Sequence, residues 1–449
     1  MPAAALADRS LHFVGIGGAG MSGLAVVAAA LGARVTGSDQ VASSASGRLA
    51  GHGIEVSIGH AAEHVPAGAE LVVSTAIPEH NPELAGARAS GATVHHRSEL
   101  LGELSELKRS IAVSGTHGKT TTAAMIAHVL MRCGREPAYL IGAELRPAGR
   151  NAAWGEGEWI VLEADESDRS LLALDREVVV VTNAELDHHD TYRALSDLEA
   201  VFAEFAAPAR VAITGPGVTL AGGLSYGIEA GELRARALEL LPLGSRFEVE
   251  GVPVELGVPG AHNALNALAA LAACREAGVE PAEAAPALAS FAGTGRRFEE
   301  RGRSVSGARI FDDYAHHPTE VRATLQAART LDPVRLIACF QPHLFSRTRE
   351  LARQFGQALA LADLVVVLDV YPARERAQDH PGVSGLTVAR TVADAAAGRP
   401  VWWVPDIGDA AAALAAELGE GDVLLSLGAG DVDRLAAALA GDEPAGIGS

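Results

Sequence analysis

The chain has 449 residues, which at roughly 150 residues per domain predicts about three domains. Hydrophobic residues make up 48% of the chain and aromatic residues 4%, which argues against disorder and favours helices packed on sheets. The formal net charge of −20 argues against nucleic acid or an anionic membrane as a general partner, because the overall field repels phosphate. Anionic ligands would therefore have to bind in local pockets.

Cysteine spacing and the lack of long apolar runs predict a cytoplasmic protein. Cys133, Cys274 and Cys339 lie far apart, so neither a disulfide framework nor a zinc knuckle is expected. Residues 1–10 lack the apolar core of a signal peptide, and no run of about 18 apolar residues predicts a membrane span. The sequence leaves the oligomeric state open.

The first unit, residues 1–107, alternates short strands with helices, which predicts a parallel sheet covered by helices. Strands are expected at 11–14, 33–37, 71–74 and 93–94, and a helix at 21–31. Gly15, Gly17 and Gly20 form a G-x-G-x-x-G loop, and Asp39 follows about 20 residues later, near where dinucleotide enzymes place a ribose-binding acid. The pattern fits a dinucleotide, another diphosphate ligand or tight packing alone.

The second unit, residues 108–293, begins with a strand at 111–113 and a second glycine loop, Gly115-Thr116-His117-Gly118-Lys119-Thr120-Thr121. A P-loop needs backbone N–H groups around the phosphates, a lysine on the β/γ oxygens and a hydroxyl on Mg²⁺. Val113 stands where the usual pattern has its first glycine, so this is a variant P-loop. Only Lys108 and Lys119 are lysines, and Lys108 is expected to be exposed.

Two further polar segments follow predicted buried strands of the second unit. Four carboxylates at 163–168 follow the strand at 159–162, which favours either a bound cation such as Mg²⁺ or a solvated acidic loop. Asp187 and His188 follow the strand at 178–181, where they fit ligands of a second metal or ordinary hydrogen-bonding groups. Residues 209–257 are predicted to form an antiparallel appendix, followed by a helix at 263–274.

The third unit, residues 294–449, is again predicted to be α/β. Its expected strands, separated by helical stretches, are 310–311, 336–340, 364–368, 401–404 and 423–427. Two arginine-bearing segments, 295–299 and 340–347, flank a polar segment at 312–318. The planar fork of arginine suits phosphate and carboxylate, and a surface salt bridge is the alternative for each arginine.

In this order, the segments resemble the Mur ligase family of cell-wall enzymes over nearly the whole chain. The matching segments are residues 12–23, 115–121, 163–168, 187–188, 260–266, 296–299, 312–320 and 340–347. The P-loop, the Asp187-His188 pair and the His262-Asn263-x-x-Asn266 segment are typical of the family. Residues 21–23 and 312–320 point to the alanine-adding member.

The resemblance implies three domains: a Rossmann-like UDP-sugar domain (1–107), a central P-loop ATPase-type α/β domain (108–293) and a C-terminal Rossmann-like α/β domain (294–449). The last would close over ATP and bind the amino acid. The implied reaction uses ATP to phosphorylate the lactoyl carboxylate of UDP-N-acetylmuramate, after which the amine of L-alanine attacks the acyl phosphate. Mg²⁺ is the implied metal, and Mn²⁺ can substitute.

Site roles also follow from the resemblance. It implies that ATP is bound by Gly115, Thr116, His117, Gly118, Lys119, Thr120, Thr121, Asn263, Asn266, Arg297 and Asp313. It implies that the substrates are bound by Gly15, Gly17, Gly18, Gly20, Met21, Ser22, Asp39, His60 and Tyr314. The implied metal ligands are Thr120 and Glu163 on one ion and His188 on a second. The implied catalytic residues are Lys119, His188, His343 and Arg347.

Three rival functions remain at this stage. The first glycine loop and Asp39 fit a nicotinamide-dependent oxidoreductase, and the P-loop alone fits a non-catalytic nucleotide-binding regulator. A ligase that adds a preformed peptide to the same sugar nucleotide is the closest rival. Phosphate release that requires both UDP-N-acetylmuramate and an amino acid separates the alanine ligase from all three.

Overall fold

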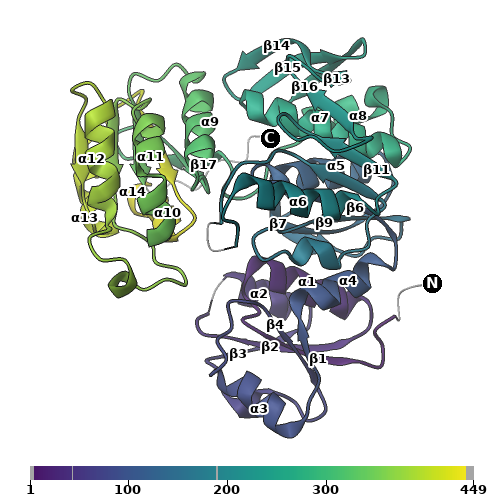
Figure 1. Ribbon diagram of the computed structural model, residues 1–449. Coiled ribbons are helices and arrows are strands. Elements are labelled where there is room, and N and C mark those ends of the chain that lie inside the picture. Colours follow the sequence, from purple (N-terminus) through teal and green to yellow (C-terminus); the bar gives the residue numbers. More distant parts are fainter. Residues whose placement is uncertain (1–4, 43, 189–190, 441–449) are drawn as a thin grey trace.

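The computed structural model describes residues 5–42, 44–188 and 191–440. These residues form three α/β bodies in succession along the chain, coloured purple, teal and green to yellow in Figure 1. The strands of each body lie mainly parallel, which confirms the predicted α/β class. The domain boundaries at 107/108 and 293/294 stay predictions.

The N-terminal body is built on a five-stranded parallel sheet with the strand order β3-β2-β1-β4-β5. Its strands are β1 (Ser10–Val14), β2 (Arg34–Asp39), β3 (Glu55–Ile58), β4 (Glu70–Val73) and β5 (Val94–His96). Its helices are α1 (Ala19–Ala30), α2 (Ser44–Gly51), α3 (Pro82–Ser90) and α4 (Arg97–Ser105). The strand order reverses between β1 and β4, and ligands of open α/β sheets bind at such a reversal. The first glycine loop follows β1 and therefore lies there.

The central body has an eight-stranded sheet with the order β13-β12-β11-β10-β6-β9-β7-β8. Its strands are β6 (Arg109–Ser114), β7 (Ala138–Leu145), β8 (Arg150–Ala153), β9 (Trp159–Glu163), β10 (Val178–Val181), β11 (Val211–Thr214), β12 (Leu224–Gly227) and β13 (Leu233–Arg234). Its helices are α5 (Lys119–Arg132), α6 (Leu195–Ala206), α7 (Ala261–Glu276) and α8 (Pro281–Ala289).

The predicted antiparallel appendix at 209–257 is wrong for its first half. Strands β11, β12 and β13 pair in parallel and extend the central sheet. The helix α6 connects β10 to β11, and such a crossover returns the chain to the same end of the sheet, which makes the two strands parallel. Only β14 (Arg236–Leu241), β15 (Gly244–Val249) and β16 (Val252–Leu256) form an antiparallel sheet.

Both faces of the central sheet are buried, as its continuous apolar strands predict. Val178 and Val180 pack in one cluster with residues of α5 and α7, whereas Val179 and Val181 pack in another with residues of α6 and α1. Helix α1 thus brings the N-terminal body onto the central sheet. A Cβ on Gly23 would lie 3.2 Å from the side chains of Asn151 and Ala152, so glycine lets α1 approach β8 closely. This packing holds the first glycine loop in place relative to the P-loop.

The C-terminal body has a six-stranded sheet with the order β17-β18-β22-β19-β20-β21, in which only β17 is antiparallel to its neighbour. Its strands are β17 (Glu299–Arg303), β18 (Arg309–Asp313), β19 (Leu336–Phe340), β20 (Leu364–Val367), β21 (Val401–Trp403) and β22 (Val423–Leu427). Its helices are α9 (Pro318–Arg329), α10 (Phe345–Glu350), α11 (Ala352–Leu359), α12 (Gly385–Ala395), α13 (Ile407–Glu417) and α14 (Arg434–Leu439). Among the described residues, no helix is both long and apolar enough to cross a membrane.

Candidate active site

Three polar loops meet at one edge of the central sheet. Strands β10, β6 and β9 are neighbours and run parallel, so their carboxyl ends lie side by side. The P-loop follows β6, the acidic segment at 163–168 follows β9, and the segment at 182–188 follows β10. The P-loop therefore lies between the acidic segment and the Asp187-His188 pair.

The P-loop backbone requires glycine at two positions. Gly115 and Gly118 have φ values of 121° and 80°, in the left-handed region that favours glycine. A Cβ on Gly115 would lie 2.2 Å from Oγ1 of Thr182, which is too close for any side chain. Helix α5 then begins at Lys119 with no side-chain cap and no acidic residue in its first turn. Its first N–H groups are therefore free to bind phosphate oxygens.

The carboxylates of the acidic segment are mostly paired with cationic side chains of this chain. Lys119 Nζ donates to Glu166 Oε1 at 2.8 Å, and Nη2 of Arg97 donates to Oδ2 of Asp165 at 3.0 Å and of Asp168 at 3.3 Å. Burial alone would raise the pKa of Asp165, but Lys119 and Arg97 hold it at about 2. The sequence favoured either a bound cation or a solvated loop for these carboxylates and gave no indication of Arg97, which lies 68 residues before Asp165.

Glu163 lies apart from these pairs. Its Oε1 accepts a hydrogen bond of 2.8 Å from Oγ1 of Thr120, and its Oε2 accepts one of 2.6 Å from the N–H of Gly142. Nε2 of His188 lies 3.5 Å from Oε1 of Glu166, and the other oxygen of Glu166 is buried with no hydrogen-bond partner among the residues that the structure describes. A set of carboxylate and hydroxyl oxygens with one imidazole fits a hard divalent cation. Glu166 is one of the four carboxylates at 163–168, and the sequence indicated no individual role for it.

An ion pair between Asp187 and Arg347 joins the central and C-terminal bodies. The Arg347 fork donates from Nε and Nη2 to the two oxygens of Asp187, both at 3.0 Å, and both side chains are buried. Burial alone would raise the pKa of Asp187, but the nearby Arg347 and His188 hold this pKa well below its usual range. Nη1 of Arg347 lies 3.3 Å from Nδ1 of His343, and burial lowers the pKa of His343 to about 4. His343 is therefore neutral near pH 7.

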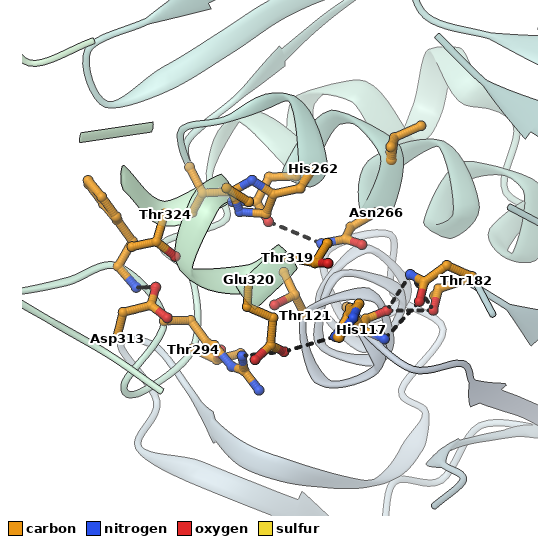
Figure 2. Close-up of a pocket in the computed structure, with 18 of the residues that line it drawn as sticks. His117, Thr121, Thr182, His262, Asn266, Thr294, Asp313, Thr319, Glu320 and Thr324 are labelled. Carbon is orange, nitrogen blue, oxygen red and sulfur yellow. Dashed lines mark hydrogen bonds and ion pairs between the residues drawn. The ribbon is translucent and has the colours of Figure 1, made fainter. Parts of the chain in front are cut away.

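A cavity of about 390 Å³ adjoins the P-loop between the central and C-terminal bodies (Figure 2). Asn263 and Asn266 of α7 form one wall, and Nδ2 of Asn266 donates to Oδ1 of Asn263 at 3.1 Å. Asp313 and Arg297 contribute to the wall from the C-terminal side. Burial raises the pKa of Asp313 to about 6, while its carboxylate accepts hydrogen bonds from backbone N–H groups. The predicted ATP-binding residues are thus brought together from both bodies.

His117 links the P-loop to helix α9 across this cavity. Its Nε2 lies 3.0 Å from Oε2 of Glu185, and its Nδ1 lies 3.4 Å from Oε1 of Glu320, a contact drawn in Figure 2. Burial lowers the pKa of His117, but the two carboxylates outweigh it and raise the pKa to about 9. The ligand atoms of His117, Glu185 and His317 lie within 4.8 Å of one another. The protonated imidazole of His117 donates to the carboxylates instead of offering a lone pair to a metal.

The first glycine loop offers backbone groups at the start of α1. Helix α1 has no side-chain cap and no acidic residue in its first turn, so its N–H groups are free for an anion. The N–H of Gly17 donates to Oδ2 of Asp39 at 2.8 Å, so Asp39 stabilises the loop itself. Met21 and Ser22 are buried in α1. Their roles, and those of Gly15, Gly18 and Gly20, stay predictions.

The remaining predicted substrate residues lie in different bodies. His60 Nδ1 is 3.0 Å from Oγ of Ser38, which donates to the buried Glu83 at 2.6 Å. Tyr314 belongs to the C-terminal body, where the guanidinium carbons of Arg296 and Arg297 lie 5.3 and 5.2 Å from its ring centroid. Only a substrate that reaches from one body to the other could contact both His60 and Tyr314.

Three family models match the chain in succession. "Mur ligase family, catalytic domain" matches residues 10–109, "Mur ligase middle domain" matches residues 113–274, and "Mur ligase, glutamate ligase domain" matches residues 296–430. A crystal structure of the UDP-N-acetylmuramate–alanine ligase from Thermotoga maritima has a TM-score of 0.84 to this chain at 29% identity. That match covers 96% of this chain and 98% of the other.

Curated relatives are more similar in sequence. The UDP-N-acetylmuramate–L-alanine ligase of Rubrobacter xylanophilus is 45% identical over 94% of this chain and 98% of its own. The protein of the same name from Streptomyces coelicolor is 46% identical over 94% of this chain and 95% of its own. Together with the three family models that match successive parts of the chain, this identity over nearly the whole length shows that the chain belongs to the Mur ligase family.

Proposed function

We propose that this chain uses ATP to join L-alanine to the lactoyl carboxylate of UDP-N-acetylmuramate, through an acyl phosphate, in the synthesis of peptidoglycan precursors. It is an ADP-forming ligase that makes an amide bond. Relatives named for this activity match the chain over nearly its whole length. The observation that carries the proposal is the meeting of the P-loop, the Glu163-Thr120 contact and the Asp187–Arg347 pair at one sheet edge.

The chemistry begins with a carboxylate, which is a poor electrophile. Phosphorylation converts one of its oxygens into a leaving group, and the amine then attacks the carbonyl carbon. Lys119 would stabilise the charge that develops on the transferred phosphoryl group by giving one of its three N–H donors to a phosphate oxygen. In the structure these donors go to Glu166 and to two P-loop carbonyl oxygens. These acceptors hold the ammonium group over the loop.

A divalent cation fits beside the phosphates, and we propose Mg²⁺, for which Mn²⁺ could substitute. Thr120 and Glu163 would hold one ion, because their oxygen atoms already lie 2.8 Å apart. His188 would hold a second ion near Glu166. When bound, such ions neutralise the negative charge of the phosphate oxygens.

His343 and Arg347 serve the amide-forming half of the reaction. Nη1 of Arg347 can only donate, so the nearby Nδ1 of the neutral His343 accepts and its Nε2 carries the proton. That N–H can donate a hydrogen bond to the oxygen on which negative charge develops in the tetrahedral intermediate. Asp187 fixes the arginine fork that holds this ring in place.

The nucleotide and the compartment complete the proposal. ATP would lie in the cavity lined by Asn263, Asn266, Arg297 and Asp313, with its phosphates on the P-loop. We place the protein in the cytoplasm, because ATP is available there and because the three cysteines are unpaired.

Phosphate release measured with each substrate omitted in turn tests the function. We expect release to require ATP, UDP-N-acetylmuramate and L-alanine together. A peptide that replaces L-alanine efficiently would indicate the peptide-adding ligase instead. Nicotinamide binding, seen as a fluorescence change on titration and unaccompanied by phosphate release, would indicate an oxidoreductase.

A further inference from the structure

Arg97 lies at the boundary between the N-terminal and central bodies. It is the first residue of α4, and its Nη2 donates to Asp165 at 3.0 Å and to Asp168 at 3.3 Å, both on the central body. The side chain of Arg97 is 21% exposed, and those of Asp165 and Asp168 are 38% and 16% exposed. A half-buried arginine held by two carboxylates has a well-defined position.

The same guanidinium also touches the first glycine loop. A Cβ on Gly20 would lie 3.2 Å from Nη1 of Arg97, so the guanidinium lies against the first turn of α1. Both hydrogen bonds to the aspartates use Nη2, and Nη1 takes no part in them. One side chain therefore contacts the glycine loop of the N-terminal body and the acidic segment of the central body.

The acidic segment continues the connection to the P-loop. Glu166 accepts the hydrogen bond of Lys119, and Asp165 interacts electrostatically with both Lys119 and Arg97. Gly20, Arg97, Asp165 and Lys119 thus follow one another from the first glycine loop to the P-loop, and the last two are linked electrostatically. The three charged residues of this series hold one another in position, because each faces a charge of opposite sign.

We propose that Arg97 is a positioning residue for the ligation, which sets the first glycine loop at the correct distance from the phosphoryl-transfer residues. This rests on the proposed function, in which the sugar nucleotide is bound at the first loop while its carboxylate must reach the phosphate bound at the P-loop. A misplacement of about 1 Å between reacting groups lowers a rate by about 10²-fold. Arg97 acts through Asp165 and Asp168 and need not touch the reacting atoms.

A second ion pair across the same boundary supplies a matched control. Arg48 of α2 pairs with Glu144 of β7 at 2.7 Å, but these side chains are 44% and 36% exposed. Exposed pairs contribute little, because water and salt screen them. Arg48→Gln therefore removes one arginine from the same boundary without removing a contact to either glycine loop.

The first experiment compares steady-state kinetics of Arg97→Gln and Arg48→Gln. We expect Arg97→Gln to lower kcat by about 10²-fold, because the bound reactants are misplaced, while the KM for ATP stays within about threefold. Arg48→Gln should stay within about twofold of the wild type. Equal activity of the two variants would overturn the proposal. A wild type that releases no phosphate with L-alanine would instead overturn the proposed function.

The second experiment is a double-mutant cycle with Asp168→Asn, which asks whether Arg97 acts through its carboxylate partners. If it does, the kcat of the double variant should lie within about threefold of the kcat of Arg97→Gln. If the kcat loss of the double variant instead equals the product of the losses in the two single variants, Arg97 does not act through Asp168 and the proposal is overturned. Arg97→Lys keeps the charge without the fork, and we expect its kcat to fall between those of the wild type and Arg97→Gln. Should Arg97→Gln fold poorly, an Arg97→Lys variant with wild-type kcat would count against the proposal.

Discussion

The two glycine loops of this chain share a local plan and differ in their surroundings. Each connects a strand to a helix, β1 to α1 and β6 to α5, and neither helix has a side-chain cap or an acidic residue in its first turn. The P-loop carries Lys119 and Thr120, which face carboxylates, whereas the backbone of the first loop donates to Asp39 and Arg97 lies beside it. We therefore propose that both loops bind anions through their backbone, and that the side chains at the P-loop restrict phosphoryl transfer to it.

The largest effect is expected when Lys119, the cationic side chain of the P-loop, is replaced. Lys119→Met should lower kcat on the order of 10²-fold or more, because a neutral side chain cannot stabilise charge on the phosphoryl group. The fold should persist with a lower free energy of unfolding, since the buried Glu166 loses its partner. Lys119→Met/Glu166→Gln should recover stability in urea unfolding without recovering activity. Retention of more than half the wild-type rate by Lys119→Met would contradict the assignment of the loop.

Alanine substitutions in the two loops should differ in their effect on stability. Gly115→Ala places a Cβ 2.2 Å from Thr182 Oγ1 at a φ of +121°, and we expect a loss on the order of 3 kcal/mol or more in the free energy of unfolding. Gly18 has a φ of −62°, and a Cβ there would lie 3.5 Å from the nearest atom, the carbonyl oxygen of Gly15. Gly18→Ala should be neutral or stabilise the fold by about 0.5 kcal/mol. Similar urea midpoints for the two variants would show that the loops are equally constrained.

The dependence of activity on a divalent metal should change only when a residue near the P-loop is replaced. His188→Ala should raise the Mg²⁺ or Mn²⁺ concentration for half-maximal activity by about tenfold, because one donor near Glu166 is lost. His128 of α5, which contacts Ala287 and Ser290, offers a control, and His128→Ala should leave the metal titration unchanged. An unchanged titration in His188→Ala, with an altered pH profile only, would point to a role as a base.

The contact between the P-loop and α9 should weaken at alkaline pH. The carboxylates around His117 raise its pKa in the folded chain from 6.5 to about 9. Its stabilising contribution is therefore complete below pH 6.5 and is lost as the pH rises through 9. We expect the free energy of unfolding to fall on the order of 2 kcal/mol across this range, and to fall less in His117→Asn. Chemical denaturation at several pH values measures how steeply the free energy of unfolding falls with pH in the wild type and in His117→Asn. An equal fall in both would exclude His117 as the group responsible.

Added bicarbonate is expected to leave the activity unchanged. A carbamylated lysine could supply an extra anionic metal ligand, but both lysines face backbone acceptors. Nζ of Lys119 donates to the carbonyl oxygen of Gly115 at 2.7 Å, and Nζ of Lys108 donates to that of Gly155 at 2.9 Å. A carbamate would be repelled by these oxygens. Activity in CO₂-depleted buffer should match that with bicarbonate, and intact mass should show no carbamate. A rate that recovers only with bicarbonate would contradict this.

The expectation that Lys108 is exposed was wrong. It is partly buried, and its Nζ lies 4.9 Å from the centroid of the Trp154 ring. Burial accordingly lowers its pKa. The neighbouring charged residues suggested a solvent-facing side chain, but the contact with Trp154 arises from the packing of a segment distant in sequence.

Local patterns predicted the strands that carry the site. The expected strands at 178–181, 336–340 and 423–427 agree with β10, β19 and β22 at both ends, because continuous apolar runs are buried on both faces of a parallel sheet. The direction of β11 relative to β10 was not predictable in the same way, because a short apolar run pairs equally well in either direction. The two strands are parallel because helix α6 connects them.

The sequence by itself determined the elements whose causes lie within a few residues: the glycine turns, the uncapped helices α1 and α5, and the polar residues that end β9 and β10. Only the tertiary structure decided which charges meet. Arg97 reaches Asp165 across 68 residues, and Arg347 reaches Asp187 across 160. Each of these residues is chemically able to pair with many others. The packing of α1 on the central sheet and of the C-terminal body beside the P-loop selects one partner, because a buried charge without a partner is strongly unfavourable.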